Sequence, residues 1–171
     1  TALGVLNWSD VKQYMLQLCD ALEYAHSRNT AHRDIKPSNM MVNGQGNLKL
    51  ADFGLAASLE GTCGSFTMDV LKAGTVSYMS PQQMEEENPQ ATDDIYSVGA
   101  TFYELLTSKP TFYRGDIAYQ VRHAAAIPMA ERLKELDVEN EIHEHVSAIV
   151  MNCLKKDRGK RPQSLRVICE W

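Results

Sequence analysis

The sequence predicts a mainly α-helical domain with one small β-hairpin, and three observations support this. Apolar residues recur at three- and four-residue steps across 9–27 and again across 142–154, the period of an amphipathic helix. Across 92–107 they occupy nearly every side of the expected helix, which indicates that it is central and buried. Residues 40–50 contain two short apolar runs around a Gly- and Asn-rich turn, as in a hairpin.

Composition limits the class of protein. With 171 residues, 44% hydrophobic and 23% charged, the chain suits one globular domain. The net charge of −5 disfavours nucleic acid as a partner, and no apolar run reaches the ~20 residues that span a bilayer. The four cysteines are scattered without a Cys-x-x-Cys pair, and the first residues do not form a signal sequence, so we expect free thiols and a cytoplasmic location.

The N-terminal half begins with a helix through about Ser27, for which Ser9 is the expected N-cap. Its buried face is predicted from the apolar positions Val11, Tyr14, Met15, Leu18, Leu22 and Ala25. A loop follows through Asn39, and then the hairpin, with strands at 40–42 and 48–50. Residues 52–90 lack a sustained period, and so long an irregular stretch within a compact domain is usually functional or disordered.

The C-terminal half contains four expected helices. The central one begins at Thr92 or Asp93, continues to Thr107 and is ended by Lys109-Pro110. The remaining segments are a short helix at 116–123, a polar connection, an amphipathic helix at 142–154 and a last helix from about residue 164.

Several short motifs occur in a fixed order. His32-Arg33-Asp34-Ile35-Lys36-Pro37-Ser38-Asn39 places Asp, Lys and Asn at set offsets in one loop, and Asp52-Phe53-Gly54 follows just after the hairpin. Further on are Gly74-Thr75, Tyr78-Met79-Ser80-Pro81, the run from Asp94 to Gly99, and Arg161-Pro162. In these motifs the chain resembles the C-terminal lobe of the Hanks-type serine/threonine protein kinases, over almost its whole length.

The resemblance implies a kinase C-lobe fold for residues 1–171, with a catalytic loop at 32–39 and an activation segment at 52–82. It implies that Asp34 accepts or orients the hydrogen of the substrate hydroxyl, and that Lys36 offsets charge on the γ-phosphate of ATP. Thr75 is expected to hydrogen-bond both of these residues and hold them in register.

The same resemblance assigns the cofactor site. Asn39 and Asp52 supply the hard oxygen ligands that Mg²⁺ prefers, and Met41 matches the position beneath the adenine of ATP. Arg33 is expected to receive a phosphate from the activation segment, with Thr67 as the best candidate acceptor and Asp69 able to supply part of that charge. Lys36 together with Thr75 favours serine or threonine in a protein as the phosphate acceptor over tyrosine or a small molecule.

Two departures from the family pattern leave alternatives open. Gln82 stands where the family usually has the Glu that pairs with Arg161, so we expect a weaker tether there. The sequence contains no Gly-x-Gly-x-x-Gly and no Val-Ala-x-Lys, so the N-lobe is expected to be absent and the 171 residues alone inactive. The competing hypothesis is a pseudokinase scaffold that binds partners without catalysis.

Overall fold

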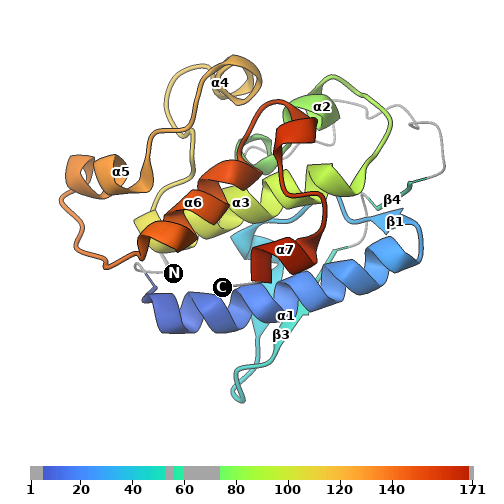
Figure 1. The fold of residues 1–171 in the computed structure, drawn as a ribbon, viewed down its shortest axis with the longest axis horizontal. Coiled ribbons are helices and arrows are strands. Elements are labelled where there is room, and N and C mark those ends of the chain that lie inside the picture. The colour runs from blue at the N-terminus through green and yellow to red at the C-terminus, as the bar shows by residue number, and fades with distance from the viewer. Residues whose placement is uncertain (1–5, 53–55, 60–73, 170–171) are drawn as a thin grey trace.

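The computed structural model describes residues 6–52, 56–59 and 74–169, and these form the mainly α-helical fold that the sequence predicts (Figure 1). The helices are α1 (Trp8–Ser27), α2 (Pro81–Met84), α3 (Ala91–Thr107), α4 (Ile117–His123), α5 (Met129–Glu135), α6 (Glu144–Cys153) and α7 (Leu165–Cys169). Short 3₁₀ helices lie at Pro37–Asn39, Val76–Tyr78 and Arg158–Lys160. The strands are β1 (Thr30–Ala31), β2 (Met40–Val42), β3 (Leu48–Leu50) and β4 (Ala57–Ser58). None of the described helices is long and apolar enough to cross a membrane.

Helix α3 runs through the middle of the molecule, between α1 on one side and α6 on the other (Figure 1). Its side chains are buried on all faces, and Tyr96, Phe102 and Tyr103 have no exposed surface. The Asp93 carboxylate accepts the Gln90 backbone N–H at 2.9 Å, which satisfies an amide at the start of the helix. The prediction of a central buried helix is therefore confirmed.

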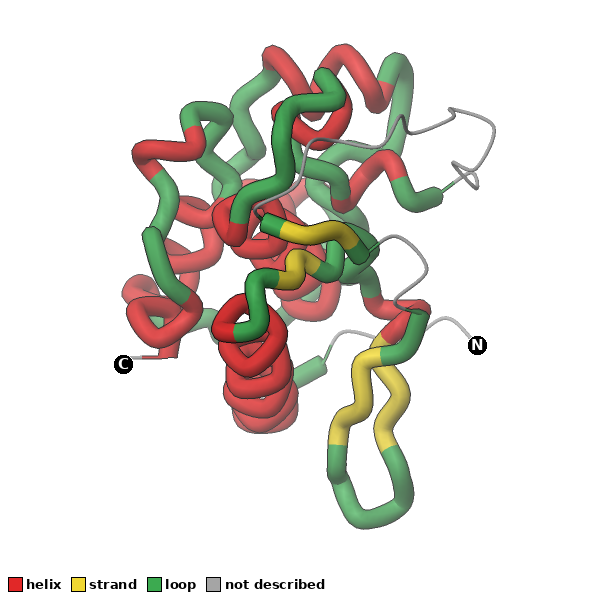
Figure 2. Tube along the Cα trace, turned by 90° about the vertical axis from the view of Figure 1, so that its right-hand side faces the viewer, coloured by secondary structure: helices red, strands yellow, loops and turns green. Residues whose placement is uncertain are grey.

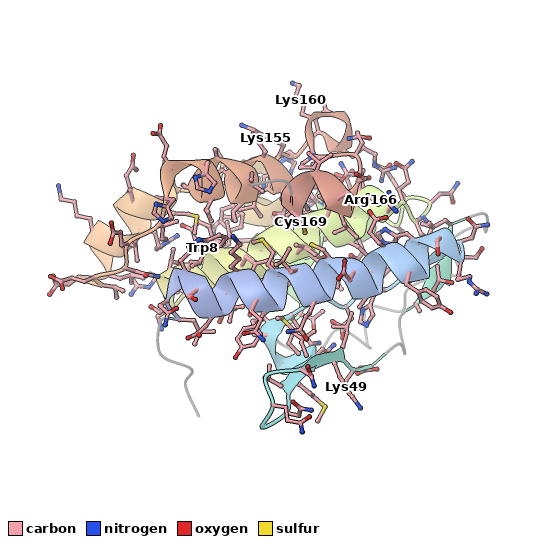
Figure 3. The ribbon with its side chains drawn as sticks, turned by 60° about the horizontal axis from the view of Figure 1, so that its bottom comes forward. Trp8, Lys49, Lys155, Lys160, Arg166 and Cys169 are labelled. Atoms are coloured by element: carbon pink, nitrogen blue, oxygen red, sulfur yellow. The ribbon has the colours of Figure 1, made fainter. Side chains whose placement is uncertain are left out.

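Helix α1 buries the predicted stripe against α3, apart from Tyr14, which is half-buried. Its N-cap is Asn7, not Ser9 as the sequence suggested: the Asn7 side chain accepts the Asp10 backbone N–H at 3.0 Å. Both residue types suit a cap. Because the helix already begins at Trp8, Ser9 lies within its first turn and Asn7 takes the cap position. At the other end of the chain α7, which contains Cys169, packs on α1 (Figure 3), and the Cys169 thiol lies near that of Cys19.

The hairpin forms where it was predicted and projects away from the helices (Figure 2). Strands β2 and β3 pair antiparallel with Met41 opposite Lys49, and Gly46 takes a φ of 79° in the turn. The Gln17 side chain of α1 accepts the Leu48 N–H at 2.8 Å and donates to the Gly46 carbonyl at 3.0 Å. Hydrogen bonds from α1 thus fix the direction in which the hairpin leaves the helices.

Helix α5 and the β1–β4 pair were not predicted. α5 lies inside the stretch expected to be a polar connection. The sequence did not indicate it because Met129 and Leu133 are the only apolar residues that it buries. Its third buried residue is Arg132, whose Nε donates to the Tyr103 hydroxyl at 3.2 Å and whose Nη2 donates to the Thr111 carbonyl at 3.1 Å. A buried charge on the inner face hides the helical period from a sequence pattern.

We predict that Gly99→Ala destabilises the protein at the α3–α6 contact. A Cβ at Gly99 would lie 2.5 Å from the Cβ of Cys153, well inside van der Waals contact. Overpacking costs about 1–3 kcal/mol and outweighs the gain in helix propensity of up to about 1 kcal/mol. Urea unfolding measures the difference; the control is Gly44→Ala, whose Cβ would meet no atom within 4 Å. Equal stability of the two variants would contradict the packing argument.

Candidate active site

The backbone of the loop 32–39 is held by one carboxylate. Asp94, fully buried in the first turn of α3, accepts the His32 N–H through Oδ2 and the Arg33 N–H through Oδ1, each at 2.8 Å. Its Oδ2 also lies 2.7 Å from the His26 Nε2 of α1. Hydrogen bonds to a charged acceptor are roughly twice as strong as neutral ones, and a buried carboxylate needs them. The loop is therefore anchored to both α3 and α1.

A polar cluster forms around Asp34. The Lys36 Nζ lies 2.8 and 2.9 Å from the two Asp34 carboxylate oxygens and donates to the Thr75 Oγ1 at 2.9 Å. The Asn39 Nδ2 donates to the Asp34 carbonyl at 2.8 Å and to its Oδ2 at 2.9 Å. Asp34 is 6% exposed, and its bonds to Lys36 and Asn39 fix the direction of its carboxylate. The predicted residues Asp34, Lys36, Asn39 and Thr75 therefore meet in space.

The position of Thr75 differs in one respect from the prediction. Among the described residues it bonds to Lys36 and not directly to Asp34, so its hold on Asp34 runs through the Lys36 ammonium. The reason is that the Lys36 Nζ stands between the two side chains and bonds to both.

His32 links the loop 32–39 to the residues around Asp52. Its Nδ1 accepts the Asp34 N–H at 3.3 Å, and the ring lies near the backbone of Ala51. Burial lowers the pKa of His32, against the opposing charges of Asp94, Asp34 and Asp52. His32 is therefore a neutral packing and positioning residue, and both Asp34 and Asp52 lie close enough to act on it.

Asn39 and Asp52 present oxygens suited to a hard cation. Because the Asn39 Nδ2 is occupied by Asp34, its Oδ1 is the amide atom available as a ligand. The Asn39 carbonyl accepts the Ala51 N–H at 2.8 Å, which brings the residue next to Asp52 beside this loop. Asp52 is exposed and has a φ of 64°, in the left-handed region that aspartate adopts more readily than most residues. An amide and a carboxylate oxygen fit Mg²⁺, which also keeps water and phosphate oxygens.

Of the other predicted residues, Met41 on β2 is 63% exposed, which leaves its side chain open to a ligand. Arg33 is buried and has a φ of 67°. Thr67 and Asp69 lie outside the described residues. The predicted link between Arg33 and Thr67 therefore stays a prediction.

Gln82 keeps its contact with Arg161. The Arg161 Nη2 donates to the Gln82 Oε1 at 2.6 Å, and the Gln82 Nε2 donates to the Lys156 carbonyl at 2.9 Å. The same guanidinium donates to the Thr92 carbonyl at 2.9 Å and to the Lys155 carbonyl at 2.7 Å. An amide in place of a carboxylate thus preserves the hydrogen bond between α2 and the segment after α6.

Sequence reasoning did not assign a role to two residues of α3 that hold the loop 32–39. Asp94 fixes its N–H groups, and the Thr101 Oγ1 donates to the Ile35 carbonyl at 3.3 Å. The available signal was polarity: both are polar residues at buried positions of the central helix, and such groups are retained where they find partners.

Comparison with known proteins agrees with these motifs. A family model described as the protein kinase domain matches residues 2–170. A probable serine/threonine-protein kinase PknB of Bifidobacterium longum is 40% identical over 73% of this chain and 19% of its own length. The serine/threonine-protein kinase PknB of Mycolicibacterium smegmatis is 35% identical over 85% of this chain and 23% of its own length. A probable serine/threonine-protein kinase of Corynebacterium efficiens is 32% identical over 94% of this chain and 24% of its own length. The chain thus spans about a fifth to a quarter of the length of these curated relatives.

We predict that His32 makes the stability of the protein depend on pH. Since its pKa in the folded state is lowered, the unfolded state binds the proton more readily, and stability is lost as pH falls below the unfolded value of about 6.5. His32→Asn removes the titration and keeps an acceptor at the Nδ1 position. The unfolding free energy of His32→Asn should be lower than that of wild type, and this deficit should shrink as the pH is lowered from about 7.5 to about 5, that is, from above to below the unfolded pKa.

Chemical denaturation at several pH values measures this deficit. His123→Asn is the control, because His123 is exposed on α4. A deficit for His32→Asn that stays constant with pH would contradict the prediction.

Proposed function

Because this chain belongs to the protein kinase family, we propose that it is the catalytic lobe of a serine/threonine kinase, which transfers the γ-phosphoryl group of Mg·ATP to Ser or Thr hydroxyls of proteins. The carrying observation is the Lys36 ammonium joined to both Asp34 and Thr75, with Asn39 pinning the same carboxylate. This cluster combines a base, a cation and an amide oxygen on one loop.

Each residue of the cluster has a defined task in this proposal. The Asp34 carboxylate accepts or orients the hydrogen of the substrate hydroxyl, and such a positioned base contributes roughly 10²- to 10⁴-fold in rate. Lys36 provides positive charge where negative charge develops. Asn39 and Asp52 would hold Mg²⁺, which when bound neutralises phosphate charge. Met41, exposed on β2, would lie beneath the adenine.

Serine or threonine is the proposed acceptor because Lys36 and Thr75 meet in space and the relatives are named serine/threonine-protein kinases. Ser38 stands where many kinases that prefer basic substrates have an acidic residue, so an arginine-directed specificity is not part of the proposal.

The activity is assigned to a longer protein that supplies the rest of the nucleotide site. A glycine-rich loop and a Val-Ala-x-Lys strand are absent from these 171 residues, and both belong to the phosphate-binding half of a kinase site.

A cytoplasmic location for this lobe is part of the proposal. Cys19, Cys153 and Cys169 are free thiols, which agrees with such a location.

The alternative function, a scaffold without catalysis, loses one of its arguments. Gln82 was a reason to suspect a degenerate domain, but its carbonyl takes the hydrogen bond from Arg161. A protein that had abandoned catalysis would have no need to keep Asp34, Lys36 and Asn39 in mutual contact.

We predict that Asp34→Ala lowers the rate of phosphate transfer by about 10²- to 10⁴-fold, since the base is removed. Asp52→Ala should lower it at least as far, because a magnesium ligand is lost. The measurement is incorporation of labelled phosphate from ATP by the full-length protein, with Asp137→Ala as a control at an exposed aspartate. Equal incorporation by wild type and both site variants would refute the assigned roles.

We also predict that Thr67 becomes phosphorylated in the active protein. A phosphate adds a charge of about −1.5 to −2 and can order a segment against an arginine such as Arg33. Mass spectrometry of the same reaction should find the phosphate on Thr67 in the wild type and not in Thr67→Ala. Its absence under activating conditions would remove Thr67 from the proposal.

A further inference from the structure

The backbone of Arg33 is held in a strained conformation from two sides. Arg33 has a φ of 67°, a region that side chains other than Gly, Asn and Asp rarely adopt. Its N–H donates to the Asp94 Oδ1 at 2.8 Å, while its carbonyl accepts from the Gln83 Nε2 at 2.7 Å. Such strain persists only where the surroundings determine it, and here helices α3 and α2 each supply one of the restraints.

Gln83 is itself rigidly placed. Its backbone N–H donates to the Ser80 Oγ at 3.0 Å, and that hydroxyl donates to the Asp93 Oδ1 at 2.9 Å. Gln83 is 4% exposed, and its Oε1 accepts no hydrogen bond from any residue in the described part of the chain. A buried amide with one atom unpaired is a poor choice for packing alone, because an apolar side chain of the same shape would avoid that cost. The donor to Arg33 explains why an amide is present.

Rotation of the Arg33–Asp34 peptide would redirect Asp34. The Asp34 N–H, which belongs to this peptide, donates to the His32 Nδ1 at 3.3 Å. A turned peptide would break that bond and move the carboxylate away from Lys36 and Asn39. Gln83 lies in α2, directly after the residues that lead from Thr75 to Ser80, so its position depends on how that segment is seated.

We propose that Gln83 is a positioning residue for Asp34: its amide holds the Arg33 carbonyl and thereby couples the seating of residues 75–80 to the direction of the base. This inference rests on the proposed function, since it assigns a role within that same site. Thr75 and Gln83 give residues 75–83 two separate connections to the loop 32–39, one to the Lys36 side chain and one to the Arg33 backbone.

The test compares full-length wild type with Gln83→Met and Gln83→Glu, using labelled ATP and a peptide substrate. Both variants keep the length of the side chain and remove the N–H donor, and the carboxylate of Gln83→Glu also repels the Arg33 carbonyl. We expect kcat to fall by about 10- to 100-fold, with the larger loss in Gln83→Glu and with KM for ATP unchanged, because the geometry of the base is altered and not the nucleotide site. Gln45→Met, at an exposed turn position, is the matched control.

The outcomes separate the two proposals. A kcat for Gln83→Met within about twofold of wild type, with only KM for the peptide or the melting temperature changed, would assign Gln83 a structural role and overturn the inference. If Gln83→Met does not fold, the comparison passes to Gln83→Glu, where an unchanged kcat has the same meaning. Lack of phosphate transfer by wild type would instead overturn the proposed function, and this inference with it.

Discussion

The site depends on a single buried negative charge, the Asp94 carboxylate at the start of α3. It is fully buried, and three hydrogen-bonding groups from α1 and the loop 32–39 converge on it. Removing a carboxylate from water is costly unless such partners are in place, so the charge and the loop conformation stabilise each other. Because the start of α3 is buried, the Asp94 carboxylate has no access to water, and the backbone N–H groups of the loop supply its hydrogen bonds instead.

From this anchor the remaining backbone of the loop is fixed group by group. Gln83 holds the Arg33 carbonyl, Asn39 the Asp34 carbonyl and Thr101 the Ile35 carbonyl. His32 then connects the loop to the neighbouring segment, since its ring accepts the Asp34 N–H and lies near the backbone of Ala51. Burial keeps the pKa of that ring low, so it can act as an acceptor at neutral pH. The functional side chains thus stand on a backbone with little freedom to move.

Two cations, the buried Arg161 and the half-buried Lys156, pack on the other side of α3. The Arg161 guanidinium lies over the Tyr96 ring and bonds to backbone carbonyls and to Gln82. Beside it, the Lys156 ammonium lies 4.6 Å from the centre of the Phe112 ring and donates to the Val121 carbonyl at 2.6 Å. Burial and the nearby Arg161 lower the pKa of Lys156 to about 8. Carbonyl oxygens, aromatic faces and the Asp93 carboxylate, 3.8 Å from the Arg161 Nη1, surround this guanidinium, which explains why Gln82 can serve where an acid is usual.

The sequence by itself determined the helical class, the central helix and the hairpin, because periodicity is a property of neighbouring residues. Its resemblance to the kinases pointed to Asp34, Lys36, Asn39 and Asp52 as candidate site residues, because their motifs are local in sequence. It did not reveal α5, whose inner face contains the buried Arg132, or the cap at Asn7, where two adequate residues compete. Tertiary structure alone decided that Asp94, Thr101 and Gln83 hold the loop. Their partners lie 50 to 66 residues away in the chain, and such contacts arise only when α2 and α3 pack beside it.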